Sequence, residues 1–581
     1  MSNYQEIFAM RVRSLVETLY PDRNSDQIIE QLFTRIAPHC AASIEENLEK
    51  WSQHTVILIT YGDSIYDPTQ QQTPLTTLHH FLRTYLRRTI SGVHILPFCP
   101  YSSDDGFAVI DYLQVNPNLG TWEDIKAIAQ DFDLMADLVL NHVSSESIWF
   151  EQFKNNQSPG KDYFITVDPD TDISQVVRPR SGPLLIPVTT TEGEKYVWAT
   201  FSEDQIDLNF ANPQVLLAIV EVLLFYMQTG AKYIRLDAVA YLWKQLGTPC
   251  IHLPETHAAI RLLREILQMV DPQAAIITET NVPNRENLSY FGNCNEAHLI
   301  YNFSLPPLLI HALLEGRSDY LRTWMMSMPP APRGCAYFNF IASHDGIGLR
   351  PAEGLLSVEE FYRLVNTLKD FGGEISYRRN PNGSESPYEV NISLFDAMKG
   401  TVRGLDQWQI ERFICANTLM MSLEGIPGFY IHTFLGTKND RRGLEATGRK
   451  RSINRYCWDI ENLEQQLNDP DSSHRIVFHR LSQLLKIRCR QPAFHPNATQ
   501  YTLHPFNRVL FMFWRQSMMR DQGLFCIFNL SDRAQTFPLS NLNLTLTDQW
   551  SDLISGQIIT DIYEPFTLQP YQSAWITNKV F

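Results

Sequence analysis

Eight short apolar segments recur along most of this chain, with helical segments between most of them. Each has six to nine residues and is rich in β-branched or aromatic side chains, as is typical of strands buried on both faces. They are Thr55–Tyr61, Gly92–Phe98, Leu134–His142, Tyr233–Val239, Ala274–Thr280, His298–Phe303, Tyr337–Asp345 and Ile426–Ile431. Eight such strands alternating with helices predict an α/β fold, the (β/α)8 TIM barrel. A doubly wound open sheet is the alternative, although no GxGxxG motif follows a strand.

Three parts of the chain do not fit this alternation. Residues 1–50 are predicted to form a helical extension before the first strand. About 90 residues separate the third strand from the fourth, which is far more than one crossover helix needs. We therefore expect residues 144–210 to form an inserted subdomain after strand 3, leaving 51–143 and 211–490 for the barrel. Beyond it, residues 491–581 alternate as antiparallel strands do, which predicts a C-terminal β domain built as a sandwich.

Composition narrows the classes of partner. Lys and Arg number 48 against 64 Asp and Glu, a net charge of −16, so a nucleic-acid partner is disfavoured. No 18-residue apolar run occurs, and the richest segment, Val215–Met227, contains Glu221, so no membrane partner is predicted. Nine cysteines without a CxxC pair favour a reducing cytoplasm. The sequence does not fix the oligomeric state, and a homodimer is one assembly that it allows.

Polar side chains stand at the ends of several predicted strands. Asp237 ends the fourth strand, Glu279 the fifth and Asp345 the seventh, while Asn141 and His142 end the third. One such carboxylate alone is most simply a surface group or a helix cap. Three at matching strand ends, each within an apolar run, predict a shared site at the C-terminal end of the barrel, where such folds carry their chemistry.

Two carboxylates that face one small substrate suit glycoside bond chemistry, in which one attacks the anomeric carbon and the other protonates the leaving oxygen. Arg235 lies two residues before Asp237, so both side chains should project to one side and the arginine should lower the pKa of Asp237. A zinc site made of His142, Asp137 and Asp237 is the competing hypothesis. No HExxH or similar spacing supports it, and we predict no metal.

Four motifs carry a family resemblance. FAVIDY with DLVLNH, IRLDAVAY, ITET and SHDGIG resemble the short motifs of glycoside hydrolase family 13, the α-amylase superfamily, and the resemblance extends from about Val56 onward. ITYGDS, GVHILPF, RLDAVAYLWKQLGTPC, NFSLPPLLIHAL and SHDGIGL are similar to its sucrose phosphorylase subfamily. The long N-terminus, SHDGIGLRPAEGLL and NPNGSESPYEVN resemble the glucosylglycerate phosphorylase branch of that subfamily.

The resemblance implies roles for the strand-end residues. Asp237 would be the nucleophile that forms a β-glucosyl-enzyme intermediate, and Glu279 would be the general acid and then the base. Asp345 would hold the 2- and 3-hydroxyls of the glucosyl unit. His344, His142 and Arg235 would complete the glucosyl subsite.

A further carboxylate would close that subsite. By the resemblance, Asp104 would bind the 4-hydroxyl, with Arg455 as its ion-pair partner. Without the resemblance, Asp104 is equally well read as a turn residue before Gly106. Asp105 is adjacent, and a shift of one residue in register would exchange the two carboxylates.

The acceptor side is predicted from loops. Arg180 matches the phosphate-binding arginine of these enzymes, and Tyr241, Tyr388 and Asn391 would line the acceptor site. A guanidinium fork suits phosphate, although the RPRSG segment can also be read as a rigid exposed loop. Four further arginines, which solvated surface charge would also explain, would suit an acceptor that carries a carboxylate; they are Arg378, Arg379, Arg441 and Arg442.

The resulting prediction is a retaining phosphorylase. It would transfer a glucosyl unit from an α-glucoside to inorganic phosphate by double displacement, giving α-D-glucose 1-phosphate without any other cofactor. A glucosylglycerate-like donor comes first and sucrose second. The alternatives are an α-glucoside hydrolase of the same fold and a carbohydrate-binding protein without catalytic activity.

Overall fold

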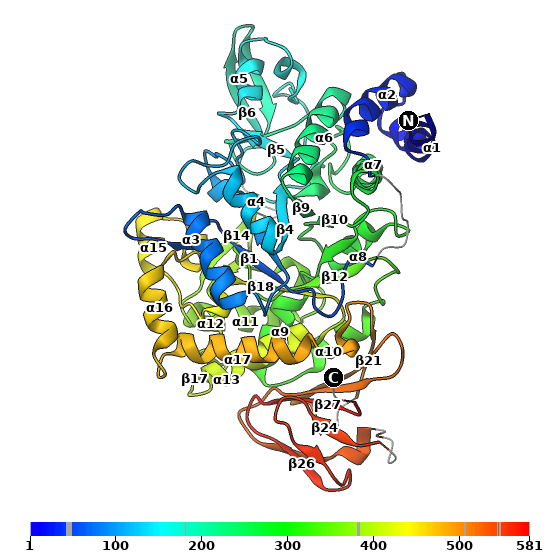
Figure 1. Ribbon diagram of the computed structural model, residues 1–581. Helices are drawn as coiled ribbons and strands as arrows, with labels where there is room; N and C mark the ends of the chain where they lie inside the picture. The colour runs from blue at the N-terminus through cyan, green and yellow to red at the C-terminus, as the bar shows by residue number, and fades with distance from the viewer. Residues whose placement is uncertain are drawn as a thin grey trace.

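The computed structural model describes residues 2–41, 49–180, 182–379, 384–504, 507–542, 544 and 548–579. At its centre eight parallel strands form a closed barrel (Figure 1). They are β1 (Ile57–Thr60), β3 (Gly92–Ile95), β4 (Asp133–Leu138), β9 (Ala231–Leu236), β10 (Ala275–Thr278), β11 (Leu299–Tyr301), β12 (Ala336–Asn339) and β18 (Ile426–Tyr430). Each of the eight predicted segments overlaps one of them, and five of the segments contain the whole strand. The last strand returns to the first, with Ile57 paired to Gly428, so the barrel is confirmed and the open sheet is wrong.

Helices surround the barrel. They include α3 (Pro74–Phe81), α4 (Trp122–Asp131), α6 (Pro213–Gln228), α7 (Pro254–Val270), α9 (Leu305–Glu315), α11 (Val358–Asp370), α13 (Gln409–Ser422) and α17 (Ser473–Arg488). Helix α6 shows how the sequence sets a boundary, because Asn212 accepts a hydrogen bond from the Gln214 amide and Pro213 occupies the first turn. Apolar side chains of these helices and of the strands form one large core. Of the described helices, none is both long enough and apolar enough to cross a membrane.

The N-terminal extension is helical, as predicted. Helices α1 (Ser2–Leu19) and α2 (Ser25–Ile36) lie against α7 and α6 on the outside of the barrel (Figure 1). Arg11 forms an ion pair with Glu265 at 3.4 Å, and Arg35 forms one with Glu221 at 2.7 Å. The extension therefore supports two barrel helices.

The insertion starts and returns at one point of the barrel rim. Strands β5 (His142–Ser144) and β8 (Gln205–Asp207) pair in antiparallel fashion, with His142 opposite Asp207. Between them lie α5 (Ile148–Lys154) and a hairpin of β6 (Leu185–Thr190) and β7 (Gly193–Trp198). This pairing places His142 at the barrel mouth.

The C-terminal part is antiparallel, as predicted. Six strands form one sheet and two form a ribbon that shares an apolar core with it. The sheet contains β20 (Thr499–Thr502), β21 (Leu510–Gln516), β22 (Gly523–Asn529), β24 (Trp550–Asp552), β25 (Ile558–Ile559) and β27 (Ser573–Thr577), and the ribbon contains β23 (Gln535–Pro538) and β26 (Pro565–Leu568). The exact limits given above for the extension, the insertion and the C-terminal domain stay predictions.

A second small sheet bears on the site. It consists of β13 (Ile347–Gly348), β14 (Glu374–Arg379) and β15 (Glu385–Asn391), with β15 in the middle. The short helix η8 (Lys450–Asn454) is attached to it, since Lys450 donates a hydrogen bond to the Ile375 carbonyl oxygen at 2.6 Å.

Candidate active site

A pocket opens at the C-terminal ends of the barrel strands and encloses about 710 Å³, its mouth included. That size suits a ligand of a few sugar-sized units. Ten of the twelve predicted site residues line it, namely Asp104, His142, Arg180, Arg235, Asp237, Tyr241, Glu279, His344, Asp345 and Tyr388. Arg455 and Asn391 are not among the lining residues.

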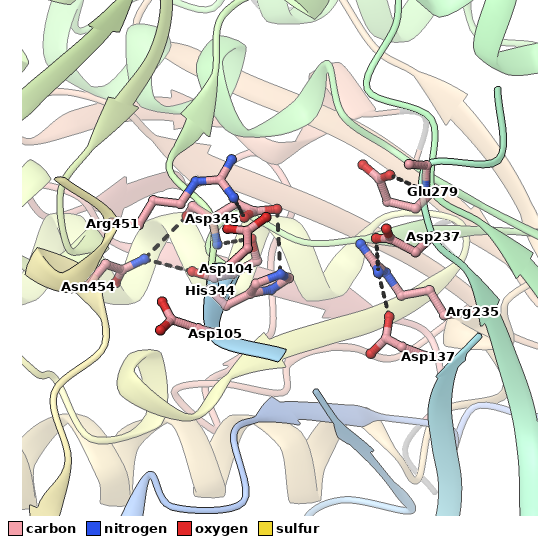
Figure 2. A network of polar contacts seen from close by, with 12 residues as sticks. Asp104, Asp105, Asp137, Arg235, Asp237, Glu279, His344, Asp345, Arg451 and Asn454 are labelled. Carbon is pink, nitrogen blue, oxygen red and sulfur yellow. Dashed lines mark hydrogen bonds and ion pairs between the residues drawn. The ribbon is translucent and has the colours of Figure 1, made fainter. Parts of the chain in front are cut away.

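Arg235 ties two strands together beneath the pocket. It is opposite Asp137 in the register of β9 with β4, and its guanidinium donates hydrogen bonds to Asp137 and, at 2.8 Å, to Oδ1 of Asp237 (Figure 2). Asp137 also lies 2.6 Å from Nε2 of His94. The predicted proximity of Arg235 and Asp237 is confirmed, and this network fixes the Asp237 carboxylate.

Glu279 directly follows β10 and lies beside Asp237. Its Oε2 accepts a hydrogen bond from the Ala238 amide at 3.1 Å. Ala238 has a φ of 48°, in the left-handed region that residues other than glycine rarely adopt. Such backbone strain is concentrated at functional sites, and here it lies directly after Asp237.

The two carboxyl groups differ in their environment. Burial raises the pKa of both, and Arg235 opposes that shift in both. The pKa of Glu279 reaches about 7, because the charges of Asp237 and Asp345 add to the effect of burial. Arg235 lowers the pKa of Asp237, as expected, but burial is the larger effect and the pKa of Asp237 is raised overall. Only Asp237 receives a hydrogen bond from Arg235, so the proton shared by this pair belongs on Glu279.

Asp345 and His344 lie on a loop and not at the end of a strand. Strand β12 ends at Asn339, six residues before Asp345, which corrects the predicted strand boundary. Burial opposes ionisation of Asp345 most strongly, yet Arg451, His344 and Arg455 together hold its pKa well below the usual value. Burial lowers the pKa of His344 to about 3, so its ring is neutral at physiological pH.

The ion pair predicted for Asp104 involves its neighbour. Arg455 donates a hydrogen bond to Asp105, and Asp105 also accepts one from Arg449 at 3.0 Å. Asp104 lines the pocket instead, and its Oδ2 accepts a hydrogen bond from Gln205 at 3.2 Å. Both aspartates have positive φ, 54° and 48°, and this tight turn sends adjacent side chains in different directions.

His142 is held by hydrogen bonds from two segments. Its Nε2 lies 2.9 Å from the Phe107 carbonyl oxygen and 3.1 Å from Nε2 of Gln205. Gln205 comes from β8, so the insertion contributes directly to the pocket. The hypothetical zinc ligands do not share one empty site, because Asp137 is already paired with Arg235 and His94.

The acceptor side contains one arginine and two tyrosines. The guanidinium carbon of Arg180 lies 5.8 Å from the ring centroid of Tyr388, and Tyr241 lines the same pocket. Within the part of the chain that the structure describes, no carboxylate forms an ion pair with Arg180. Arg180 is therefore available to an anionic ligand.

Two of the four additional arginines form ion pairs outside the pocket. Arg378 pairs with Glu353 at 2.8 Å and Arg441 with Glu374 at 3.3 Å, both outside the pocket. Arg442 does not line the pocket either. The side chain of Arg379 and residues 380–383 lie outside the described residues. Arg378, Arg441 and Arg442 therefore give no support to an acceptor that carries a carboxylate.

Asn391, which was predicted at the acceptor site, is not among the residues that line the pocket. It lies on β15 and is buried. Its Nδ2 donates hydrogen bonds to Glu374 and Ser376, so Asn391 joins β15 to β14.

Several pocket residues were missed from the sequence. They are Phe107, Phe201, Gln205, Asn281 and Arg451. Of these, only Arg451 could have been suggested by the sequence. It lies on η8, four residues before the predicted site residue Arg455. The others are side chains of loops and of the insertion, whose positions no periodic pattern predicts.

Comparison with known proteins agrees with this geometry. Residues 84–345 match the α-amylase catalytic domain family. A glucosylglycerate phosphorylase of Allomeiothermus silvanus is 45% identical over 91% of this chain and 92% of its own, and one of Escherichia coli is 39% identical over 97% and 99%. The crystal structure of sucrose 6F-phosphate phosphorylase from Thermoanaerobacter thermosaccharolyticum superposes with a TM-score of 0.71 at 25% identity, covering 83% of this chain and 96% of that one.

The family match includes Asp237, Glu279 and Asp345, and the two glucosylglycerate phosphorylases match more than nine tenths of the chain. The two glucosylglycerate phosphorylases share more of this sequence than the sucrose 6F-phosphate phosphorylase does. The chain belongs to the α-amylase family, glycoside hydrolase family 13.

Proposed function

We propose that this protein is a glucosylglycerate phosphorylase, which transfers the glucosyl unit of an α-glucoside of glycerate to inorganic phosphate with retention. The observation that carries the proposal is a pocket that holds two carboxyl groups in different environments and, at its acceptor side, Arg180, which pairs with no carboxylate among the described residues. Relatives with this activity are 39–45% identical over almost the full chain.

The first step breaks the bond between the anomeric carbon and the oxygen of glycerate. Asp237 attacks the anomeric carbon, and Glu279, protonated because its pKa is about 7, gives its proton to the departing oxygen. The products are a β-glucosyl ester of Asp237 and free glycerate. Asp345, kept ionised, would hold two sugar hydroxyls while positive charge develops at the anomeric carbon.

The second step returns the glucosyl unit to phosphate. A phosphate oxygen attacks the anomeric carbon, its proton passes to Glu279, and the bond to Asp237 breaks. Two inversions restore the α configuration, giving α-D-glucose 1-phosphate. Arg180 would bind the phosphate, because an unpaired guanidinium forms two parallel hydrogen bonds to such an anion.

The acceptor can be tested with neutral and anionic donors. The protein is incubated with phosphate and glucosylglycerate, glucosylglycerol or sucrose, and α-D-glucose 1-phosphate is measured. We expect glucosylglycerate to be the best donor, because the relatives that share most of this sequence are glucosylglycerate phosphorylases. Glucosylglycerol, which has a neutral hydroxymethyl group in place of the carboxylate, is the matched neutral donor. If sucrose is preferred, the protein is a sucrose phosphorylase and the acceptor assignment is wrong.

The phosphate site needs its own test. Arg180→Ala should raise the KM for phosphate about 10- to 100-fold, which corresponds to the loss of a charge-assisted hydrogen-bond pair. Arg178→Ala is the matched control, because Arg178 is exposed and outside the pocket. Release of free glucose at a rate independent of phosphate, with Arg180→Ala unchanged, would instead indicate an α-glucoside hydrolase. Glucoside binding without turnover would indicate a carbohydrate-binding protein.

The cellular setting follows from the cysteines. All nine lie within the described residues, and all are unpaired. We infer a reducing cytoplasm, with an α-glucoside and phosphate as small-molecule partners. The homodimer and the absence of a nucleic-acid partner stay predictions.

A further inference from the structure

Arg451 is shared between two carboxylates. Its Nη1 lies 2.6 Å from Oδ1 of Asp345, while Nε and Nη2 donate hydrogen bonds to Glu389 at 3.1 and 2.8 Å. The Glu389 side chain is only 3% exposed. A planar guanidinium bound through two nitrogens cannot rotate freely, so Glu389 fixes the direction in which Arg451 meets Asp345.

Distant segments of the chain converge on this contact. Arg451 comes from η8, whose Asn454 also donates a hydrogen bond to the Ser343 carbonyl oxygen at 2.7 Å (Figure 2). Glu389 comes from β15 and is opposite Gly348 of β13, three residues after Asp345. The loop that carries Asp345 is therefore held on one side by η8 and on the other by β15.

Gly346 shows how closely Glu389 approaches this loop. A Cβ atom at position 346 would lie 2.5 Å from Cγ of Glu389 and 2.8 Å from the Val390 carbonyl oxygen. Neither distance is compatible with a real side chain. The residue after Asp345 is thus required to be glycine by the presence of β15, which couples the two segments sterically as well as electrostatically.

The arrangement leaves part of Asp345 free for a ligand. Arg451 contacts Oδ1, whereas the group near Oδ2 is the neutral ring of His344, at 3.6 Å. The Asp345 side chain remains 27% exposed, toward the pocket. Arg451 also forms an ion pair with Glu389, so it contacts Asp345 from one side only. The other side of the Asp345 carboxylate stays open to the pocket.

We propose that Glu389 and Arg451 are a positioning pair that orients the Asp345 carboxylate toward the glucosyl unit. Arg451 acts through Asp345, and Glu389 acts through Arg451. The inference deepens the proposed function and rests on the role of Asp345 in it. It adds two residues to the machinery, and one of them, Glu389, does not line the pocket.

The test is a double-mutant cycle with Asp345. Arg451→Met should lower kcat/KM for glucosylglycerate about 100-fold, and Arg451→Lys, which keeps the charge but not the fork, should recover about tenfold of that loss. Glu389→Gln should cost about tenfold. In an Asp345→Asn background, Arg451→Met should lower kcat/KM by less than about threefold, because Asp345, through which Arg451 acts, is already impaired.

Controls separate this role from simple stability. Arg363→Met removes an arginine that pairs with three glutamates on and near α11, outside the pocket, and should change kcat/KM less than about twofold. If Arg451→Met does not fold, as judged from thermal unfolding, Glu389→Gln in the same two backgrounds decides the question. Equal losses in both backgrounds would overturn the proposal.

The proposed function can be wrong while the role of the Glu389–Arg451 pair is right, and a second donor distinguishes the two cases. If the wild-type protein does not act on glucosylglycerate, the cycle is run with α-glucosyl fluoride, which any retaining α-glucosyl enzyme of this type should accept. Non-additivity with that donor would uphold the positioning pair while the acceptor assignment falls.

Discussion

Arg455 forms its ion pair with Asp105, while the preceding residue, Asp104, faces the pocket. The adjacent carboxylates therefore have different tasks. Asp104 is placed to meet a ligand, whereas Asp105 connects its turn to the loop after η8. The same arginine donates a hydrogen bond to the His344 carbonyl oxygen at 2.9 Å, so it supports the Asp345 loop as well.

This division of tasks predicts different effects of two adjacent substitutions. If Asp104 binds the sugar as proposed, Asp104→Asn should lower kcat/KM about 100-fold with little change in thermal stability, because a charged hydrogen-bond partner of the substrate is lost. Asp105→Asn should lower the melting temperature and cost less than about tenfold in kcat/KM, since the exposed part of that ion pair is screened. Steady-state kinetics and thermal unfolding of both variants check the assignment. The reverse order of effects would mean that Asp105 binds the sugar.

The roles proposed for Asp237 and Glu279 can be distinguished by donors with different leaving groups. Asp237→Asn should lower turnover of every donor by about 10⁴-fold or more, because no covalent intermediate forms. Glu279→Gln should show a comparable loss with glucosylglycerate but a far smaller one with α-glucosyl fluoride, whose leaving group needs no proton. If both variants behave alike with the fluoride, the roles of acid and nucleophile are wrongly assigned.

The raised pKa of Glu279 predicts a limit to activity on the alkaline side. The acid must be protonated in the free enzyme, so kcat/KM should fall as the pH rises through about 7. Protonated Glu279 contributes to the stability of the folded state. This contribution is fully present below the pKa that Glu279 has in the unfolded chain, and it is lost as the pH rises through its pKa in the folded protein. Glu279→Gln should therefore raise the melting temperature relative to wild type at pH 8 but not at pH 5. A rise at both pH values would point to relief of packing strain instead.

A buried ion pair behind His142 predicts a large effect on stability. Nζ of Lys244 lies 2.6 Å from Asp207 and donates a hydrogen bond to Asn141 at 2.6 Å, and the charged pair is almost fully buried. Lys244→Met leaves Asp207 charged and unpaired and should lower the free energy of unfolding by about 3–5 kcal/mol. Lys232→Met is the control, because its pair with Asp133 is a quarter to a third exposed and should contribute about 1 kcal/mol or less. Chemical denaturation of both variants compares them, and equal effects would contradict the importance of burial.

The sequence by itself determined the barrel and the centre of its site. Strands that are buried on both faces are apolar along their whole length, so all eight could be located from the sequence. Residues such as Asp237 and Glu279 directly follow their strands. Because the C-terminal ends of parallel strands meet at one rim, these residues had to converge. Arg235 and Asp237 are two residues apart along one extended segment, so the sequence also predicted that their side chains lie on the same side.

Only the tertiary structure decided the residues that loops position. Asp104 and Asp105 differ in direction because both have left-handed backbone conformations, and the Asn391 side chain is bonded to β14 instead of lining the pocket. Arg451, Gln205 and Glu389 reach the site from η8, the insertion and a separate sheet. The pKa of Glu279 also depends on burial and on two charges distant in sequence. Such relationships arise from long-range packing, which local periodicity and spacing do not encode.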